Sequence, residues 1–83
     1  MRIETSKGKR FDARLMTELT ADDSLLIQLN DQKRKLSRMA ADFEGLAFIT
    51  SEETGLRFEG YAVLRSISRL DQSTVQLRLY KEG

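Results

Sequence analysis

The sequence predicts an α+β fold, with a mostly antiparallel sheet of about five to six strands and one helix, near residues 32–44, packed across it. Three observations support this prediction. Hydrophobic and polar residues alternate along 10–19 and 75–80, turn-forming residues separate these segments from other β-rich segments, and one stretch has hydrophobic residues at helical spacing. Because 83 residues can enclose one hydrophobic core only, we expect residues 1–83 to form a single domain.

The first predicted element is a β-hairpin. Segments 2–5 and 10–19 flank Ser6-Lys7-Gly8-Lys9, where Gly8 can adopt the positive φ that a tight turn needs. Met16 interrupts the alternation of the second arm. The alternating hydrophobic residues of that arm are Phe11, Ala13, Leu15 and Leu19.

Residues 20–44 allow two interpretations. In the favoured one, a strand containing Leu25, Ile27 and Leu29 ends at Asn30-Asp31, and a helix then begins near residue 32. The alternative is a single helix of about 24 residues capped by Thr20. Gly45 ends the helix in both, and the hydrophobic face of the shorter helix contains Leu36, Met39, Ala40 and Phe43.

The remaining segments read as strands. Segments 46–50 and 56–70 are rich in β-forming residues and are separated by a turn at 51–55. The Glu59-Gly60 step predicts a bulge or bend, because glycine packs nothing inside a strand. A turn at 71–73 then leads into the cleanest alternating strand, 75–80.

The composition argues against an enzyme. The chain contains neither Cys nor His, so it lacks a thiolate nucleophile, a zinc cluster and the usual general base near neutral pH. Glu52, Glu53 and Glu59 match no calcium-binding spacing, and no glycine-rich phosphate loop is present. We therefore predict no catalytic residue, no metal site and no cofactor. Without a signal-like or membrane-spanning hydrophobic run, we expect a cytoplasmic protein with no membrane partner.

Local charge offers one binding hypothesis, since 14 basic and 13 acidic residues leave a net charge of only +1. The predicted helix begins with a basic cluster that could contact an anion or nucleic acid, against the alternative of a solvated helix face. A second basic group on the first hairpin could instead protect a sheet edge from unwanted pairing. The first cluster comprises Lys33, Arg34, Lys35 and Arg38, and the second comprises Arg2, Lys7, Lys9, Arg10 and Arg14.

The aromatic residues suggest a second hypothesis. We expect Phe43, Phe48 and Phe58 to pack in the core. Tyr61 and Tyr80 are candidate interface residues, because a tyrosine at the wet side of a sheet often anchors a protein interface.

Segments 36–45 and 58–68 together resemble small phage-encoded and prophage-encoded proteins of unassigned function. The resemblance implies a structural or assembly accessory, in tail morphogenesis for example, that assembles through sheet edges and could be virion-associated. The opening hairpin also resembles the start of the ubiquitin-type β-grasp fold.

The leading functional hypothesis is a non-enzymatic protein-interaction or assembly module that contacts a protein partner or copies of itself. The alternative is a small nucleic-acid-binding module that uses the basic cluster at the start of the helix. No small-molecule substrate is inferred. Partner identity, subunit number and strand order stay open at this stage.

Overall fold

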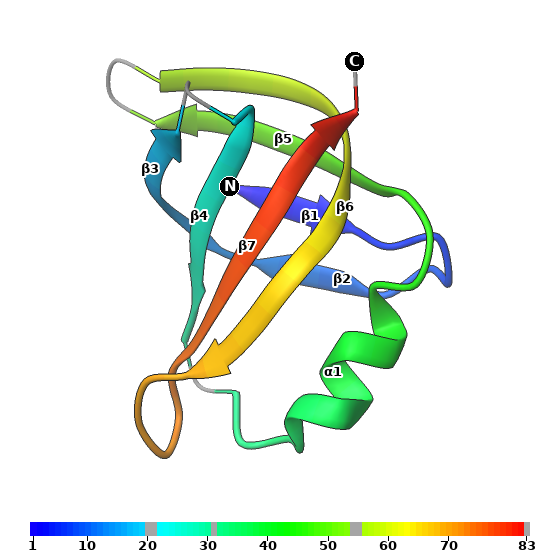
Figure 1. The fold of residues 1–83 in the computed structure, drawn as a ribbon, viewed down its shortest axis with the longest axis vertical. Coiled ribbons are helices and arrows are strands. Elements are labelled where there is room, and N and C mark those ends of the chain that lie inside the picture. Colours follow the sequence, from blue (N-terminus) through cyan, green and yellow to red (C-terminus); the bar gives the residue numbers. More distant parts are fainter. Residues whose placement is uncertain (20–21, 31, 54–55, 83) are drawn as a thin grey trace.

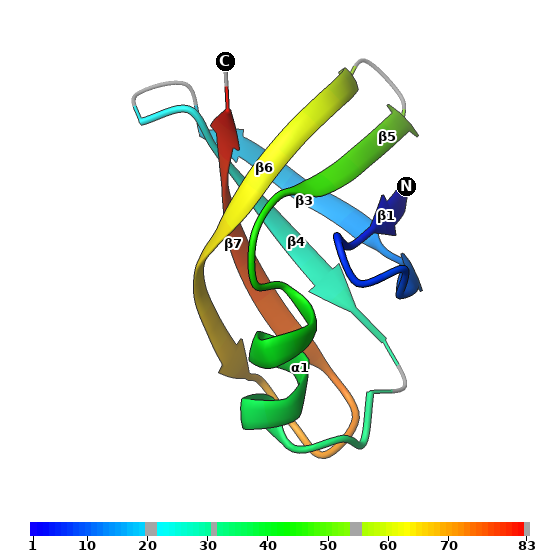
Figure 2. The same ribbon diagram turned by 90° about the vertical axis from the view of Figure 1, so that its right-hand side faces the viewer.

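The computed structural model describes residues 1–19, 22–30, 32–53 and 56–82, and Figures 1 and 2 show its fold from two sides. Seven strands form one sheet, and a single short helix lies beside it. The elements are β1 (Arg2–Glu4), β2 (Arg10–Asp12), β3 (Arg14–Leu19), β4 (Ser24–Leu29), α1 (Leu36–Asp42), β5 (Ala47–Glu53), β6 (Leu56–Arg69) and β7 (Val75–Glu82).

The sheet is almost closed on itself. Its strand order is β2-β1-β5-β6-β7-β4-β3, and every pairing is antiparallel. β2 and β3 are the two ends of this order, yet only Ala13 separates them in the chain. The backbone N–H of Ala13 donates to the carbonyl of Met1 (2.9 Å), and the chain bends there from one end of the sheet to the other. The sheet therefore curls into a small barrel (Figure 1).

The interior of this barrel is filled by the alternate residues of almost every strand. Burial of these apolar side chains supplies the main driving force for folding. The fully buried side chains that form the hydrophobic core include Ile3, Leu25, Ile27, Leu29, Met39, Ile49, Val75, Leu77 and Leu79.

The predicted opening hairpin is confirmed. Ile3 pairs with Phe11, and Gly8 has a φ of 82° in the turn between the arms. Met16, which interrupts the sequence alternation, lies where the pairing of β3 with β4 shifts register between Leu15 and Thr17. The prediction of about five to six strands is too low, because the bend at Ala13 divides the second hairpin arm into two strands with different neighbours.

The strand-then-helix interpretation of the middle segment is confirmed, but the helix is shorter than predicted. It covers Leu36–Asp42 instead of 32–44, and Lys35 at its N-cap has an extended backbone. Arg69 accounts for the late start, because its guanidinium donates to the carbonyl of Gln32 (2.8 Å) and to that of Arg34. Those hydrogen bonds hold residues 32–35 outside the helix.

The helix closes one end of the barrel. Met39 is fully buried, and the ring of Phe43 stacks on that of Phe11 with centroids 5.2 Å apart. Figure 2 shows α1 next to the C-terminal part of β6. As predicted, Gly45 follows the helix end, with a φ of 84°.

Of the two alternatives predicted at Glu59-Gly60, a bulge or a bend, the bulge is wrong. Gly60 pairs with Ile49 in regular register, and the register shift of β6 lies between Leu64 and Ser66 instead. The glycine makes room for an aromatic ring, since a Cβ at this position would lie 3.3 Å from Cζ of Phe58.

Two further boundaries differ from the prediction. β5 continues through Glu53, so the first three residues of the predicted turn at 51–55 belong to a strand. The rest of that turn, residues 54 and 55, lies outside the described residues. Phe48 faces outward and is only half-buried, so its assignment to the core is also wrong.

The predicted turn at 71–73 is confirmed, and Asp71 organises it. Its Oδ1 accepts hydrogen bonds from the backbone N–H groups of Ser73 (2.9 Å) and Thr74 (2.8 Å). The hydrogen bond from the Ser73 backbone is the main reason that the pKa of Asp71 is lower in the fold than its ordinary value.

This hydrogen bonding predicts a pH dependence of stability. Because the folded pKa of Asp71 is below the unfolded one, its carboxylate stabilises the fold above about pH 4, and this contribution is lost as the pH falls through the folded value. We expect Asp71→Asn to lose less stability between pH 7 and pH 3 than the unmodified chain, as measured by urea unfolding. The pKa of Asp22 is also lowered, chiefly by the Ser24 hydroxyl, so some dependence will persist. Equal losses in both proteins would contradict this assignment.

Candidate interaction surface

The outer face of β5, β6 and β7 carries a continuous group of hydrophobic side chains. Phe48 lies opposite Tyr61, and Val63 lies opposite Tyr80, so the group crosses all three strands. Leu46 precedes β5 and is exposed next to the buried Ala47. We call this group the aromatic band, and it consists of Leu46, Phe48, Tyr61, Val63 and Tyr80.

The sheet holds the two tyrosines of the aromatic band in place. The rings of Phe48 and Tyr61 meet edge to face with centroids 5.2 Å apart. The guanidinium of Arg65 lies 5.9 Å from the centroid of the Tyr80 ring. Tyr61 nevertheless remains 52% exposed and Tyr80 39% exposed. Both rings are therefore available for contact without a change in the backbone.

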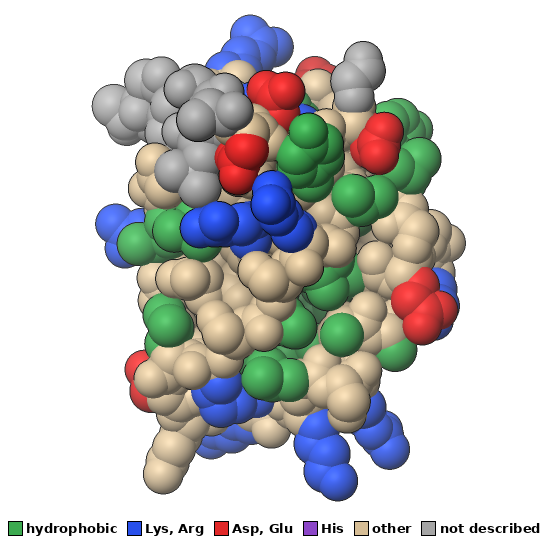
Figure 3. All heavy atoms as spheres, in the orientation of Figure 1, with side chains coloured by type: hydrophobic (Ala, Val, Ile, Leu, Met, Phe, Trp, Pro, Cys, Tyr) green, Lys and Arg blue, Asp and Glu red, His purple; other side chains and the backbone are tan. Residues whose placement is uncertain are grey.

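Charged residues flank the aromatic band along the strands. On β6, Glu59 precedes the band and Arg65 follows it. On the antiparallel β7, Glu82 lies opposite Tyr61, and Arg78 lies at the other end, opposite Ser66. Arg57 on β6 is paired with Glu52, and Arg65 is paired with Asp22, so charges of both signs occur on each side of the band. Figure 3 shows hydrophobic side chains exposed among charged ones on the side of the molecule that carries β6 and β7.

Arg65 is already engaged within the chain. Its Nη1 lies 3.2 Å from Oδ2 of Asp22, and its guanidinium also covers Tyr80. This ion pair adds to the hydrogen bond from the Ser24 hydroxyl in lowering the pKa of Asp22. Arg65 is therefore held beside the aromatic band.

Most of the predicted basic cluster lies before the helix. Of its residues Lys33, Arg34, Lys35 and Arg38, only Arg38 lies within α1. The side chain of Arg34 forms an ion pair with Asp42, the last residue of the helix. Lys33, Lys35 and Arg38 are exposed. The prediction that the cluster occupies the first turns of the helix is therefore wrong, and one of its four charges is neutralised locally.

The basic group on the first hairpin has partly structural contacts. Lys7 donates from Nζ to the carbonyl of Ala41 (2.8 Å) and lies 3.5 Å from Oε2 of Glu44, which ties the hairpin to α1. Arg10 pairs with Glu4 at 3.6 Å. Arg2, Lys9 and Arg14 are exposed.

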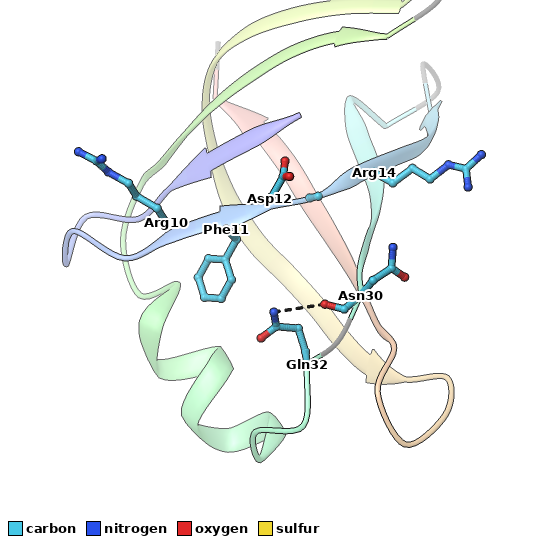
Figure 4. Close-up of a pocket in the computed structure, with 7 residues that line it drawn as sticks. Arg10, Phe11, Asp12, Arg14, Asn30 and Gln32 are labelled. Carbon is cyan, nitrogen blue, oxygen red and sulfur yellow. Dashed lines mark hydrogen bonds between the residues drawn. The ribbon is translucent and has the colours of Figure 1, made fainter.

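A hollow of about 360 Å³ lies beside β2, between that strand and the segment after β4. Figure 4 shows the Arg10 and Arg14 side chains extending in opposite directions, while the Phe11 ring points toward α1. Ionisable groups therefore do not converge in the hollow, and its geometry does not assemble an acid–base pair. Its lining residues are Arg10, Phe11, Asp12, Ala13, Arg14, Asn30 and Gln32.

The other candidate sites can be placed within the part of the chain that the structure describes. No group of three or more acidic residues there could hold a metal ion. Glu52 pairs with Arg57 at 3.8 Å on the neighbouring strand. In the same part of the chain, no helix is long and apolar enough to span a membrane.

Sequence reasoning missed Arg69, which fixes the segment before the helix. Its position did carry a signal, because Arg69 pairs with the buried Val75 at a position where the strand pattern calls for a hydrophobic residue. A cation at such a position needs hydrogen-bond acceptors, and the loop carbonyls provide them.

Comparison of the chain with protein-family models, curated proteins and solved structures found no match.

Proposed function

We propose that this chain is a non-enzymatic protein-interaction or assembly module that binds its partner through the aromatic band. The observation that carries the proposal is the pair of exposed tyrosines on the central strands of the sheet. Tyrosine is enriched among the residues that dominate binding energy, because it offers a large rigid apolar surface together with a hydroxyl group.

The distribution of exposed hydrophobic residues supports this choice of surface. Among the described residues, the large hydrophobic side chains that are exposed include Leu46, Tyr61 and Tyr80 of the aromatic band. The others are Met16 at the register shift of β3 and Leu70 at the end of β6. Isolated exposed hydrophobic residues are common on protein surfaces, whereas a continuous group is typical of a binding site.

The proposal includes an assembly role. The resemblance to small phage and prophage proteins favours a structural or accessory component whose activity is binding, made in the cytoplasm and incorporated into a larger particle. The near-closure of the sheet shifts the proposed contact from the strand edges to the outer face, because the two end strands of the sheet are consecutive in the chain.

Site-specific photo-crosslinking tests the proposal. Benzoylphenylalanine at position 61 should form discrete adducts in the cells that naturally make the protein, because its side chain lies within the proposed interface. Position 70 is the matched control, since Leu70 is 55% exposed but lies outside the aromatic band. We expect a second substitution, Tyr80→Ser, to abolish the adduct formed at position 61. Equal adducts at both positions, or none at position 61, would contradict the proposal.

Nucleic-acid binding is the second candidate, and the exposure of Lys33, Lys35 and Arg38 favours it. It requires an affinity for DNA or RNA that falls with salt and that is lost in the variant Lys33→Glu/Lys35→Glu. The ion pair of Arg34 with Asp42 weighs against it, because that pair removes one cation from the cluster.

A further inference from the structure

We propose that the partner of the aromatic band is a second copy of this chain, bound face to face in a dimer with twofold symmetry. This inference rests on the proposed function and identifies its partner. It is carried by the order of charges along β7, which makes this strand complementary to itself about Tyr80.

The charges of β7 are symmetric about Tyr80. Glu82 and Arg78 each lie two residues from Tyr80 on the outer face. On the neighbouring β6, Tyr61 lies opposite Glu82, and Ser66 lies opposite Arg78. β7 therefore presents opposite charges at equal distances from one exposed aromatic ring.

A twofold axis in the plane of the interface and perpendicular to the strands makes these sides meet. Such an axis reverses the strand direction of the second copy but keeps β6 opposite β6 and β7 opposite β7. When the axis passes through Tyr80, which lies midway between Glu82 and Arg78 on β7, Glu82 of one copy faces Arg78 of the second copy. Symmetry repeats each contact, as in any isologous interface. The Tyr80 rings of the two copies meet near the axis.

The opposite orientation is disfavoured. If the strands of the two copies ran in the same direction about an axis along β7, Glu82 would face Glu82 and Arg78 would face Arg78, and like charges at an interface are repulsive. The charges thus select one orientation, while the aromatic band supplies the apolar contact. The net charge of +1 imposes little overall repulsion between copies.

A dimer of standard size would cover a modest part of the surface of this chain. A standard interface takes about 800 Å² from each partner, roughly a seventh of the 5300 Å² that this chain exposes. The aromatic band and its flanking charges extend over three of the seven strands.

Charge exchange on β7 tests this arrangement by sedimentation equilibrium, from about 10 μM to 1 mM protein in low salt. Arg78 and Glu82 are suitable because both side chains lie on the outer face and neither contributes to the hydrophobic core. We expect the unmodified chain to dimerise, and Arg78→Glu or Glu82→Arg alone to raise the dissociation constant by about tenfold or more, since each creates two repulsive contacts. Lys33→Glu changes the net charge as much as Arg78→Glu and should leave dimerisation unchanged.

Restoring complementarity should restore the dimer. The double variant Arg78→Glu/Glu82→Arg reverses the charge order and should dimerise again, and an equal mixture of the two single variants should form a heterodimer. Recovery in the double variant excludes a folding defect as the cause of the single-variant effects. Addition of about 0.5 M NaCl should weaken the unmodified dimer, because salt screens these contacts.

The outcomes separate this inference from the proposed function. If the unmodified chain stays monomeric at 1 mM while position 61 crosslinks to a different protein, the dimer is excluded and the interaction module stands. If the chain is monomeric and position 61 forms no adduct, both proposals fail. If a dimer forms but the double variant fails to recover it, the proposed orientation is wrong.

Discussion

Phe43→Ala is expected to destabilise the protein by about 3–5 kcal/mol. The Phe43 ring is 3% exposed and stacks on Phe11, so its removal leaves a cavity between α1 and β2. A helix of seven residues has almost no stability of its own, and its place depends on this packing. For a domain of this size the loss is a large fraction of the total free energy of unfolding. Urea unfolding measures it.

Phe48→Ala is the matched control for that experiment. It removes the same ring from the outer face of β5, where Phe48 is half-buried against Tyr61. We expect a loss of only about 1 kcal/mol, because the Phe48 ring lies on the outer face and its removal leaves no closed cavity. If the two variants lost the same stability, the assignment of inner and outer faces would be wrong.

Leu77→Ala is expected to cost about 2–5 kcal/mol. Leu77 is fully buried in the middle of β7 and is paired with Ile67 on one side and with Ile27 on the other. The resulting cavity would lie between two neighbouring strands, which restrict how far the surrounding side chains can move to fill it.

Leu70→Ala provides the comparison for Leu77→Ala. Leu70 is 55% exposed in the turn after β6, and its truncation should change the free energy of unfolding by less than about 0.5 kcal/mol. A loss at Leu77 as small as that at Leu70 would contradict the position of β7 at the centre of the core.

Much of the fold can be predicted from local sequence patterns. Alternation identifies the strand at 75–80, and the turn composition around Gly8 identifies the first hairpin. The Asn30-Asp31 break correctly separates a strand from a helix, because these residues favour element ends over helix interiors. These features depend on residues that are close in the sequence, so single-sequence reasoning can recover them.

The errors arise where distant residues decide the local structure. The start of α1 is set by Arg69, which lies more than thirty residues away and hydrogen-bonds to the carbonyls that an earlier helix start would use. The division of the second hairpin arm at Ala13 reflects closure of the whole sheet.

The candidate surface was predictable only in part. Tyr61 and Tyr80 can be named from the sequence as interface candidates, and that assignment stays a prediction. Phe48 points outward because its neighbours Ala47 and Ile49 point inward. Residue type alone would place the phenylalanine in the core. The charges of β7 can be read from the sequence, but their place beside Tyr61 becomes visible only through the pairing of Tyr61 with Glu82.

The most direct test of the association surface is an amide NMR spectrum recorded at increasing protein concentration. The account predicts concentration-dependent shifts at Phe48, Tyr61, Val63 and Tyr80, with unchanged signals from Lys33 and Lys35. Shifts centred on the segment before α1, or a spectrum that does not change up to about 1 mM, would contradict self-association through the aromatic band.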